Sequence, residues 1–184
     1  MAKKLLVLCM AAIMAVAALV AGCGGDQKAA SDNKVLKVGT NADFAPFEFQ
    51  DENGKEYQGF DMDLIRAIGE EMGYKVEISN IQFDGLIPAI QAGNIDVAIT
   101  GMTINEERKQ NVLFSDPYYK SGLSIIVAKD NNDIKTFQDL KGKKVAVQIG
   151  TTSAAEVNKI GGVDVKEFNS SADTFMELRA KGVD

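Results

Sequence analysis

Strand-like and helix-like patterns alternate along the chain from residue 35, and this alternation constrains the fold more than any other feature. Short apolar, β-branched segments predict strands, and segments with apolar residues three or four positions apart predict helices. In the first run, strands are predicted at 35–40, 75–79 and 95–100 and helices at 60–72 and 84–92. A second run has predicted strands at 123–128, 144–148 and 163–168 and predicted helices at 136–140 and 153–160. This alternation is typical of the α/β fold class.

Local signals support the ends of the predicted helices. Gly73 follows the helix 60–72 at the position where a C-terminal cap is expected,. Asp84 is a candidate N-terminal cap for the helix 84–92, which tolerates Pro88 because that residue falls near its first turn. Residues 119–122 join the two runs, and they predict either a crossing strand or hinge, or an ordinary connection inside one domain.

The N-terminus carries the signals of an exported protein. Two lysines precede an apolar stretch, residues 5–20, that is short for a membrane span and fits a secretory signal peptide, predicted to cover 1–22,. Small residues immediately before Cys23 resemble the lipobox of bacterial lipoproteins, so Cys23 is the predicted lipidation site. The alternative is an ordinary signal peptide with an incidental cysteine. Residues 23–34 have little apolar surface and predict a flexible, lipidated tether.

Composition excludes several kinds of chemistry. The chain has 2 Cys and no His, and both cysteines, Cys9 and Cys23, lie ahead of the predicted fold. A Ser-His-Asp or Cys-His arrangement is therefore excluded, as is a zinc site built from imidazole or thiolate. The net charge of -6 and the lack of a basic stripe argue against nucleic acid,. A small molecule or a protein remains as partner, and we expect no metal and no cofactor.

The segment 96–108 is the strongest candidate for a binding site. A predicted strand ends at Thr100 and Gly101, where small residues leave backbone groups accessible, and Asn105 precedes a predicted helix start,. Arg108 follows, and its flat guanidinium offers paired donors suited to a carboxylate. Together these groups could hold a zwitterion. In the alternative, the segment is an ordinary capped helix whose Arg108 pairs with a neighbouring glutamate or with solvent.

Other candidate residues lie at further strand ends. Phe44 follows the first predicted strand and Phe83 follows the second, where aromatic rings can wall a ligand in an open α/β sheet. The alternative is that both rings simply pack under loops. Residues 148–153 follow a strand and open a helix, so their free N–H groups could receive a carboxylate, although an ordinary Ser or Thr cap explains the same letters.

Four motifs together resemble the polar amino-acid binding proteins of bacterial ABC importers: residues 39–49, 59–64, 93–96 and 114–118. The likeness runs from Val35 to the last residue. The resemblance implies a periplasmic-binding-protein-like fold of type II, with two α/β lobes and a hinge. The implied boundaries are 35–119 for lobe 1, 120–122 for the hinge and 123–184 for lobe 2. The same superfamily includes dehydratase-like enzymes, sensor domains and glutamate-receptor ligand cores.

The resemblance also implies roles for the groups that would hold the backbone of a bound amino acid. Arg108 would pair with the ligand α-carboxylate, assisted by the backbone N–H groups of Thr103 and Thr152. The Gly101 carbonyl and the Thr103 hydroxyl would face the α-ammonium group.

Further roles concern the ligand side chain. Phe44 and Phe83 would sandwich the ligand, while Asn41 and Gln148 match positions that meet its side chain. Relatives resembling glutamine binders carry Asp and Lys at those last two positions, so a polar amino acid is implied without a choice of glutamine. The remaining candidate site residues are Thr100, Met102 and Thr151.

The implied function is capture of a polar amino acid and its delivery to an ABC permease by a lipid-anchored, extracytoplasmic, monomeric protein that is not an enzyme. A dehydratase-like enzyme or a sensor domain on the same fold are the alternatives. Relatives continue beyond the segment 177–184 to an acidic residue that binds the ligand ammonium, and to a return hinge strand and C-terminal helices. We therefore expect a fragment with an incomplete second lobe.

Overall fold

A computed structural model describes residues 34–184 as one compact unit. The predicted signal peptide, Cys23 and all but the last residue of the predicted tether lie outside the described residues. Within the described range, no helix combines the length and the apolar character needed to cross a membrane.

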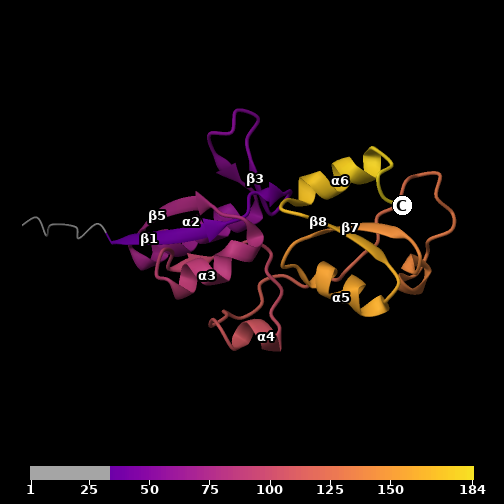
Figure 1. Cartoon of the computed structure of the whole chain (residues 1–184). Coiled ribbons are helices and arrows are strands. Elements are labelled where there is room, and N and C mark those ends of the chain that lie inside the picture. The colour runs from indigo at the N-terminus through magenta and orange to yellow at the C-terminus, as the bar shows by residue number, and fades with distance from the viewer. Residues whose placement is uncertain (1–33) are drawn as a thin grey trace, which may run out of the picture. The chain divides into compact units, whose positions relative to one another are not determined.

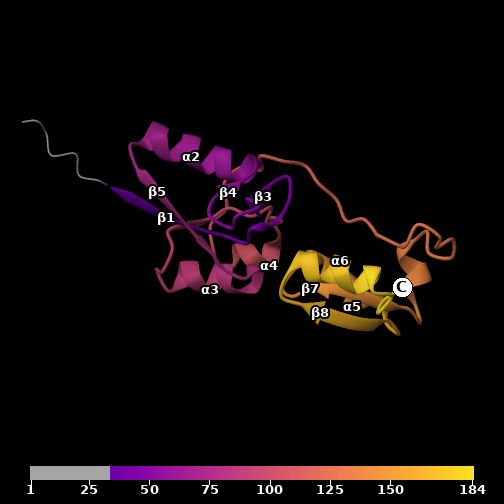
Figure 2. The same cartoon turned by 90° about the horizontal axis from the view of Figure 1, so that it is seen from above.

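A parallel sheet organises the first run of elements. Strand β1 (Val35–Thr40) lies between β5 (Lys75–Asn80) and β6 (Val97–Ala98), and both neighbours pair with it in parallel. Helices α2 (Phe60–Met72) and α3 (Leu86–Gln91) lie on opposite faces of this sheet (Figures 1 and 2). The predicted α/β fold is therefore confirmed in this part of the chain.

The core of this first run lies between β1 and α2. Val38 and Met62 are fully buried, and Ile65 and Ile99 pack with them. The apolar stripe predicted from the helical spacing supplies part of this core, and burying such a stripe stabilises a helix more than its propensity does. Gly73 adopts the left-handed conformation and its N–H bonds back to the helix, which confirms the predicted C-terminal cap,.

The start of the helix after β5 differs from the prediction. A 3₁₀ turn, η1 (Phe83–Gly85), precedes α3, and Gly85 occupies the cap position without a side-chain cap bond. The prediction that Asp84 caps this helix is wrong, because the residue lies inside η1. Pro88 is the third residue of α3, where its missing N–H costs no helical hydrogen bond.

A small antiparallel sheet that was not predicted links β1 to α2. It consists of β2 (Asp43–Phe44), β3 (Glu48–Gln50) and β4 (Tyr57–Gln58), with β3 in the middle. Strands of two or three residues give too short a pattern to detect in a sequence. Their effect is to bring Glu48 against the start of α2, where it is almost completely buried.

The second run of elements also forms a parallel sheet. Strands β7 (Lys144–Gln148) and β8 (Asp164–Phe168), predicted at 144–148 and 163–168, pair in parallel along their whole length. Helices α5 (Thr152–Ile160) and α6 (Ser171–Arg179) lie on opposite faces of this pair (Figure 1). The predicted helix at 136–140 is a 3₁₀ turn, η2 (Phe137–Leu140). The buried core of this run is Ile134, Leu140, Val147, Ala154 and Val157.

The predicted strand at 123–128 and the possible crossing strand at 119–122 are wrong. Both segments lack regular structure and lie in the long connection that follows α4 (Glu106–Lys109) (Figure 2). A strand requires a neighbour with which to exchange backbone hydrogen bonds, and no described strand pairs with these residues. Their apolar composition is therefore typical of a strand, but they have no partner strand among residues 34–184.

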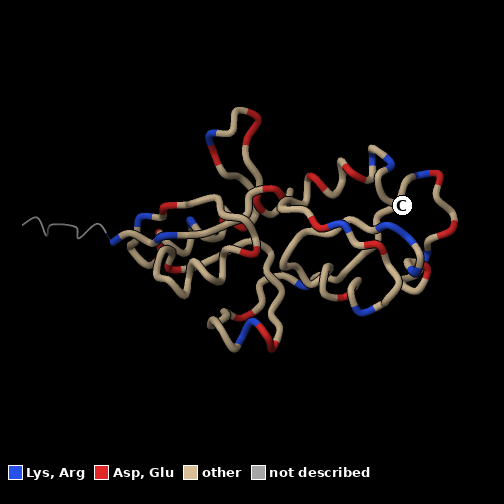
Figure 3. Tube along the Cα trace, in the orientation of Figure 1, with Lys and Arg blue, Asp and Glu red and all other residues tan. Residues whose placement is uncertain are grey.

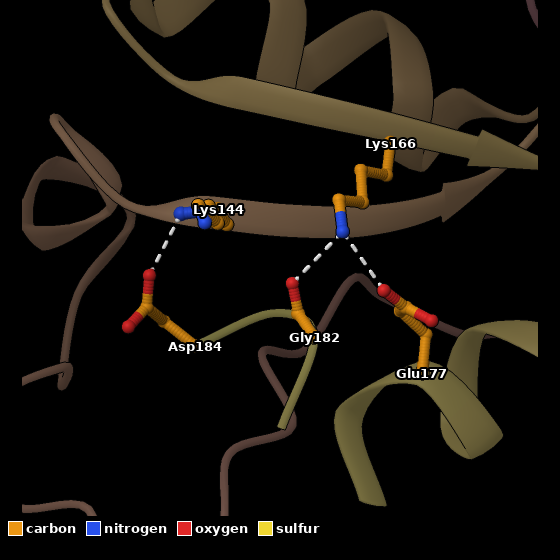
Figure 4. A network of polar contacts seen from close by, with 5 residues as sticks. All are labelled: Lys144, Lys166, Glu177, Gly182 and Asp184. Carbon is orange, nitrogen blue, oxygen red and sulfur yellow. Dashed lines mark hydrogen bonds and ion pairs between the residues drawn. The ribbon is translucent and has the colours of Figure 1, made fainter. Parts of the chain in front are cut away.

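A polar network attaches the last residues to the second sheet (Figure 4). Lys166 on β8 donates to Glu177 Oε1 at 2.9 Å and to the Gly182 carbonyl at 3.0 Å. The Asp184 N–H donates to the Lys144 carbonyl at 2.9 Å, and the Lys144 N–H donates to Asp184 Oδ2 at 2.8 Å. The chain after α6 thus runs back against β7.

Candidate functional site

A cavity of about 2230 Å³ extends along the connection 111–127 and β7 and includes the carboxyl ends of the strands. In α/β sheets this is the edge at which ligands bind. Every binding residue predicted from the sequence lines the cavity: Asn41, Phe44, Phe83, Thr100, Gly101, Met102, Thr103, Arg108, Gln148, Thr151 and Thr152. The fold therefore brings together candidates that are up to 111 positions apart in the sequence, from Asn41 to Thr152.

The segment after β6 is held in place by hydrogen bonds to side chains. Strand β6 itself covers only Val97–Ala98 rather than the predicted 95–100, because it pairs with β1 at only two positions. Beyond it, the Gly101 N–H donates to Asp61 Oδ2 at 2.9 Å, and Thr100 Oγ1 accepts from the Asn41 N–H at 3.0 Å. These bonds fix a backbone that no strand ladder holds.

Arg108 is the third residue of the short helix α4 and is only 8% exposed. Asn105 caps this helix through its side chain, as predicted, by accepting from the Arg108 N–H at 2.8 Å. The guanidinium donates to the Thr103 carbonyl at 2.8 Å and to the Gly150 carbonyl at 3.0 Å. It also lies 5.3 Å from the centroid of the Phe83 ring.

These contacts test the alternative in which Arg108 pairs with a neighbouring glutamate or with solvent. The guanidinium does not pair with a neighbouring glutamate; Glu106 instead forms an ion pair with Lys109 at 2.8 Å. Burial lowers the pKa of Arg108, because it removes water from the charged group. A buried cation bonded only to carbonyls gains from an anionic partner.

Asn41 and Gln148 contact each other at the cavity. Gln148 Nε2 donates to Asn41 Oδ1 at 2.7 Å and to the Asn169 carbonyl at 3.1 Å. Gln148 Oε1 accepts from the Ser171 hydroxyl at 2.9 Å. The two amides predicted to meet a ligand side chain thus form one polar patch, orientated by neighbouring groups.

The two predicted aromatic walls differ in their surroundings. Phe44 is 46% exposed and stacks on Phe47 with ring centroids 6.1 Å apart. Phe47 in turn makes an edge contact with Tyr119 at 4.9 Å. Phe83 lies beneath the guanidinium of Arg108, in a cation–π arrangement,. Neither ring is packed away from the cavity, since both line it.

The segment before α5 contains an ordinary helix cap. Thr151 Oγ1 accepts from the Ala154 N–H at 3.2 Å and donates to the Gln148 carbonyl at 2.8 Å. Thr151 therefore caps α5, and its contact with a ligand stays a prediction. Thr152 is the first residue of α5, and the first N–H groups of a helix have no partner inside the helix.

Three carboxyl groups near the cavity were not identified as site residues from the sequence. Glu48 and Asp61 are buried, and Asp43 is half-buried. Asp43 Oδ2 accepts from the Ser171 N–H at 3.0 Å, while its other oxygen has no partner among the described residues. Burial raises the pKa of Asp43. For Glu48, the sequence signal that was available is a charged residue between two phenylalanines, in Phe47-Glu48-Phe49.

The fold and the site together define a class of protein. Strand ends from an α/β fold place a buried guanidinium, two amides and aromatic rings around a cavity, which is the arrangement of a protein that binds small polar molecules. The comparisons identify that class further. The family model for bacterial extracellular solute-binding proteins, family 3, matches residues 36–182, and the chain belongs to this family.

Similar proteins bind amino acids. The arginine-binding extracellular protein ArtP of Bacillus subtilis (strain 168) is 34% identical over 186 residues, covering 99% of this chain and 71% of ArtP. Other curated relatives are a probable histidine-binding protein of Neisseria gonorrhoeae and the L-cystine-binding protein TcyJ of Escherichia coli (strain K12). A substrate-binding role is therefore shown for this chain.

Solved structures agree with this assignment. An ancestral arginine-binding protein bound to arginine has a TM-score of 0.80 and 53% identity, covering 82% of this chain and 67% of that one. An ancestral amino-acid-binding protein described as a precursor of cyclohexadienyl dehydratase has a TM-score of 0.78 and 46% identity, with coverage of 82% and 67%. The relatives named here are binding proteins, and the last is a precursor of an enzyme.

Proposed function

We propose that this protein captures a polar amino acid in the cavity at the strand ends and delivers it to an ABC importer. In this proposal the two α/β runs are lobes that close around the ligand, joined by the connection that includes 120–122. Arg108 binds the α-carboxylate, with help from the N–H groups of Thr103 and Thr152. The buried guanidinium of Arg108, bonded only to carbonyls, is the observation that carries the proposal.

We further propose that arginine is the ligand to test first. Two of the relatives described above are named for arginine. In this chain, the side chain of Asp43 lines the cavity and supplies a carboxyl group there. A guanidinium would supply donors and would offset the burial that raises the pKa of Asp43, and the ring of Phe44 beside it suits a cation.

Arginine is expected to raise the thermal unfolding midpoint of the purified chain. A ligand that binds only the folded state stabilises it by about 2.7 kcal/mol at 100 times its Kd. For a chain of this size that is a shift of roughly 5 to 10 °C. Differential scanning fluorimetry with each standard amino acid measures it. No shift with any of them would contradict amino-acid binding.

The variant Asp43→Asn separates arginine from neutral ligands. It keeps an acceptor for the Ser171 N–H but removes the charge, so arginine affinity should fall about tenfold to a hundredfold, the range of a charged hydrogen bond. Glutamine affinity should stay within about threefold. Isothermal titration of both ligands checks this, and equal losses for both would remove Asp43 as the arginine determinant.

We also propose that lipid on Cys23 anchors the mature protein to the outer face of the cytoplasmic membrane, as the lipobox-like residues before it suggest. One acyl chain binds membranes only reversibly, while two hold a protein stably. In cells that process lipoproteins, Cys23→Ala should therefore move the protein from the membrane fraction to the soluble fraction. Membrane retention of this variant after a salt wash would argue against the anchor.

A further inference from the structure

Two carboxyl groups are buried beneath the segment that follows β6. Glu48, on β3, is 1% exposed, and Asp61, in the first turn of α2, is fully buried. Buried carboxyl groups are rare unless they are paired, because burial removes the water that stabilises their charge. Neither residue belongs to the predicted set of ligand contacts, so their position requires another explanation.

Each carboxyl group uses one oxygen to hold the cavity wall. Glu48 Oε1 accepts from the Thr100 hydroxyl at 3.0 Å. Asp61 Oδ2 accepts from the Gly101 N–H at 2.9 Å and from the Tyr118 hydroxyl at 2.9 Å. Thr100 and Gly101 follow shortly after the last residue of β6, Ala98, and begin the candidate site. The pair therefore supports that part of the site from behind.

The second oxygen of each carboxyl group has no hydrogen-bond partner among the described residues. These two oxygens, Glu48 Oε2 and Asp61 Oδ1, are also inaccessible to water. If both groups were ionised, two unpaired negative oxygens would be buried on side chains that interact with each other, which is strongly unfavourable. One proton held between the two carboxyl groups satisfies both oxygens, because a protonated carboxyl is a donor.

We infer that Glu48 and Asp61 share one proton, and that this pair positions Thr100 and Gly101 for ligand binding. The inference on ligand binding rests on the proposed function, whereas the shared proton does not. Glu48 and Asp61 are positioning residues in this account, acting through the strand-end segment rather than by touching the amino acid.

Electrostatics agree with Glu48 as the carrier of the proton. Burial, and then the negative charge of Asp61, raise the pKa of Glu48 from 4.5 to about 9, with a hydrogen bond to the Asp61 side chain contributing. Asp43, on β2, adds to this rise. Tyr118, in the connection after α4, also faces the pair, and burial and the charge of Asp61 raise its pKa. Glu48 therefore stays neutral at pH 7.

The raised pKa has a definite consequence for folding. Between 4.5 and about 9 the folded state holds a proton on Glu48 that the unfolded state releases. The contribution is fully present below the lower value and is lost as pH rises through the upper one. Within that window, each pH unit should lower the folding equilibrium constant up to about tenfold through this group.

Two substitutions of Glu48 test the shared proton without any ligand. Glu48→Gln mimics the neutral carboxyl, with an amide donor toward Asp61 and an acceptor for the Thr100 hydroxyl. Its stability relative to the wild type should rise with pH, up to about tenfold in the folding constant per unit. Urea unfolding at half-unit steps from about pH 5 to 9 measures this. A constant difference between the two proteins would overturn the shared proton.

Glu48→Met keeps a similar volume but removes both hydrogen bonds, so it tests the positioning. Amide hydrogen exchange at Gly101 should accelerate at least about tenfold in this variant and stay near the wild-type rate in Glu48→Gln. Affinity for the ligand found in the amino-acid screen should fall in Glu48→Met and stay near the wild-type value in Glu48→Gln. Equal exchange in both variants would refute the positioning role. A wild-type protein that binds no amino acid would instead refute the proposed function, while both ligand-free readouts still decide the pair.

Discussion

Replacing Arg108 with alanine is expected to weaken amino-acid binding by roughly 30-fold to 3000-fold. Truncating one partner of a buried, hydrogen-bonded charge pair costs about 2 to 5 kcal/mol, and every 1.4 kcal/mol is about a factor of ten in Kd. The guanidinium also donates to the carbonyls of Thr103 and Gly150, so its removal loosens both sides of the proposed carboxylate site. Isothermal titration with the ligand identified by thermal shift measures the loss.

Two further variants make this result specific. Arg108→Lys keeps a charge but lacks the planar fork, so we expect an affinity between those of the wild type and the alanine variant. Arg66→Ala removes a second arginine, whose side chain is 46% exposed and bonds to the Tyr57 carbonyl away from the cavity. Its affinity should match the wild type. An alanine variant at position 108 that binds within about threefold of the wild type would remove Arg108 as the anchor.

Gly59→Ala is expected to be the most destabilising single-methyl substitution in the first α/β run. Gly59 precedes α2 with φ 117° and ψ 173°, a conformation that is almost restricted to glycine. A Cβ there would overlap the Phe47 carbonyl and lie 2.8 Å from the Pro46 oxygen. Backbone strain and overpacking each cost about 1 to 3 kcal/mol, so we expect a loss of roughly 2 to 6 kcal/mol.

Gly54→Ala is the matched control for this substitution. Gly54 also has a positive φ, of 66°, but a Cβ there meets nothing within 4 Å. Only the backbone penalty remains, about 1 kcal/mol. Chemical denaturation of both variants compares the crowded Gly59 with a glycine of positive φ that has no close neighbour. Equal losses would show that the close approach of Phe47 to the start of α2 contributes nothing to stability.

The sequence predicted best the elements whose residues carry their own periodicity. The bounds of α2 and of β1 and β7 match the prediction, because each buries a regular apolar pattern that can be recognised locally. The segment 123–128 has a similar apolar pattern and yet forms no strand. Strand formation depends on a neighbouring strand, and a local pattern contains no information on that neighbour.

The candidate site likewise has features that local sequence predicts and features that only tertiary contacts create. Arg108 and Asn105 were identified from the sequence because the cap and the guanidinium lie within one helical turn of each other. The contact between Asn41 and Gln148 joins residues 107 positions apart, and periodicity cannot predict it. Thr151 shows the opposite case, since a local pattern predicted a Ser or Thr cap and its hydroxyl does cap its own helix, while its contact with a ligand stays a prediction.

The sequence by itself determined the alternation of strands and helices, the family, and a set of polar and aromatic residues at strand ends, because these are encoded in short, local patterns. Only the tertiary structure decided which of those residues meet around one cavity, and that Glu48 and Asp61 lie buried behind the wall of the site. The physical reason is that burial and hydrogen bonding depend on neighbours brought together by packing, and a carboxyl group changes its role when packing removes water from it.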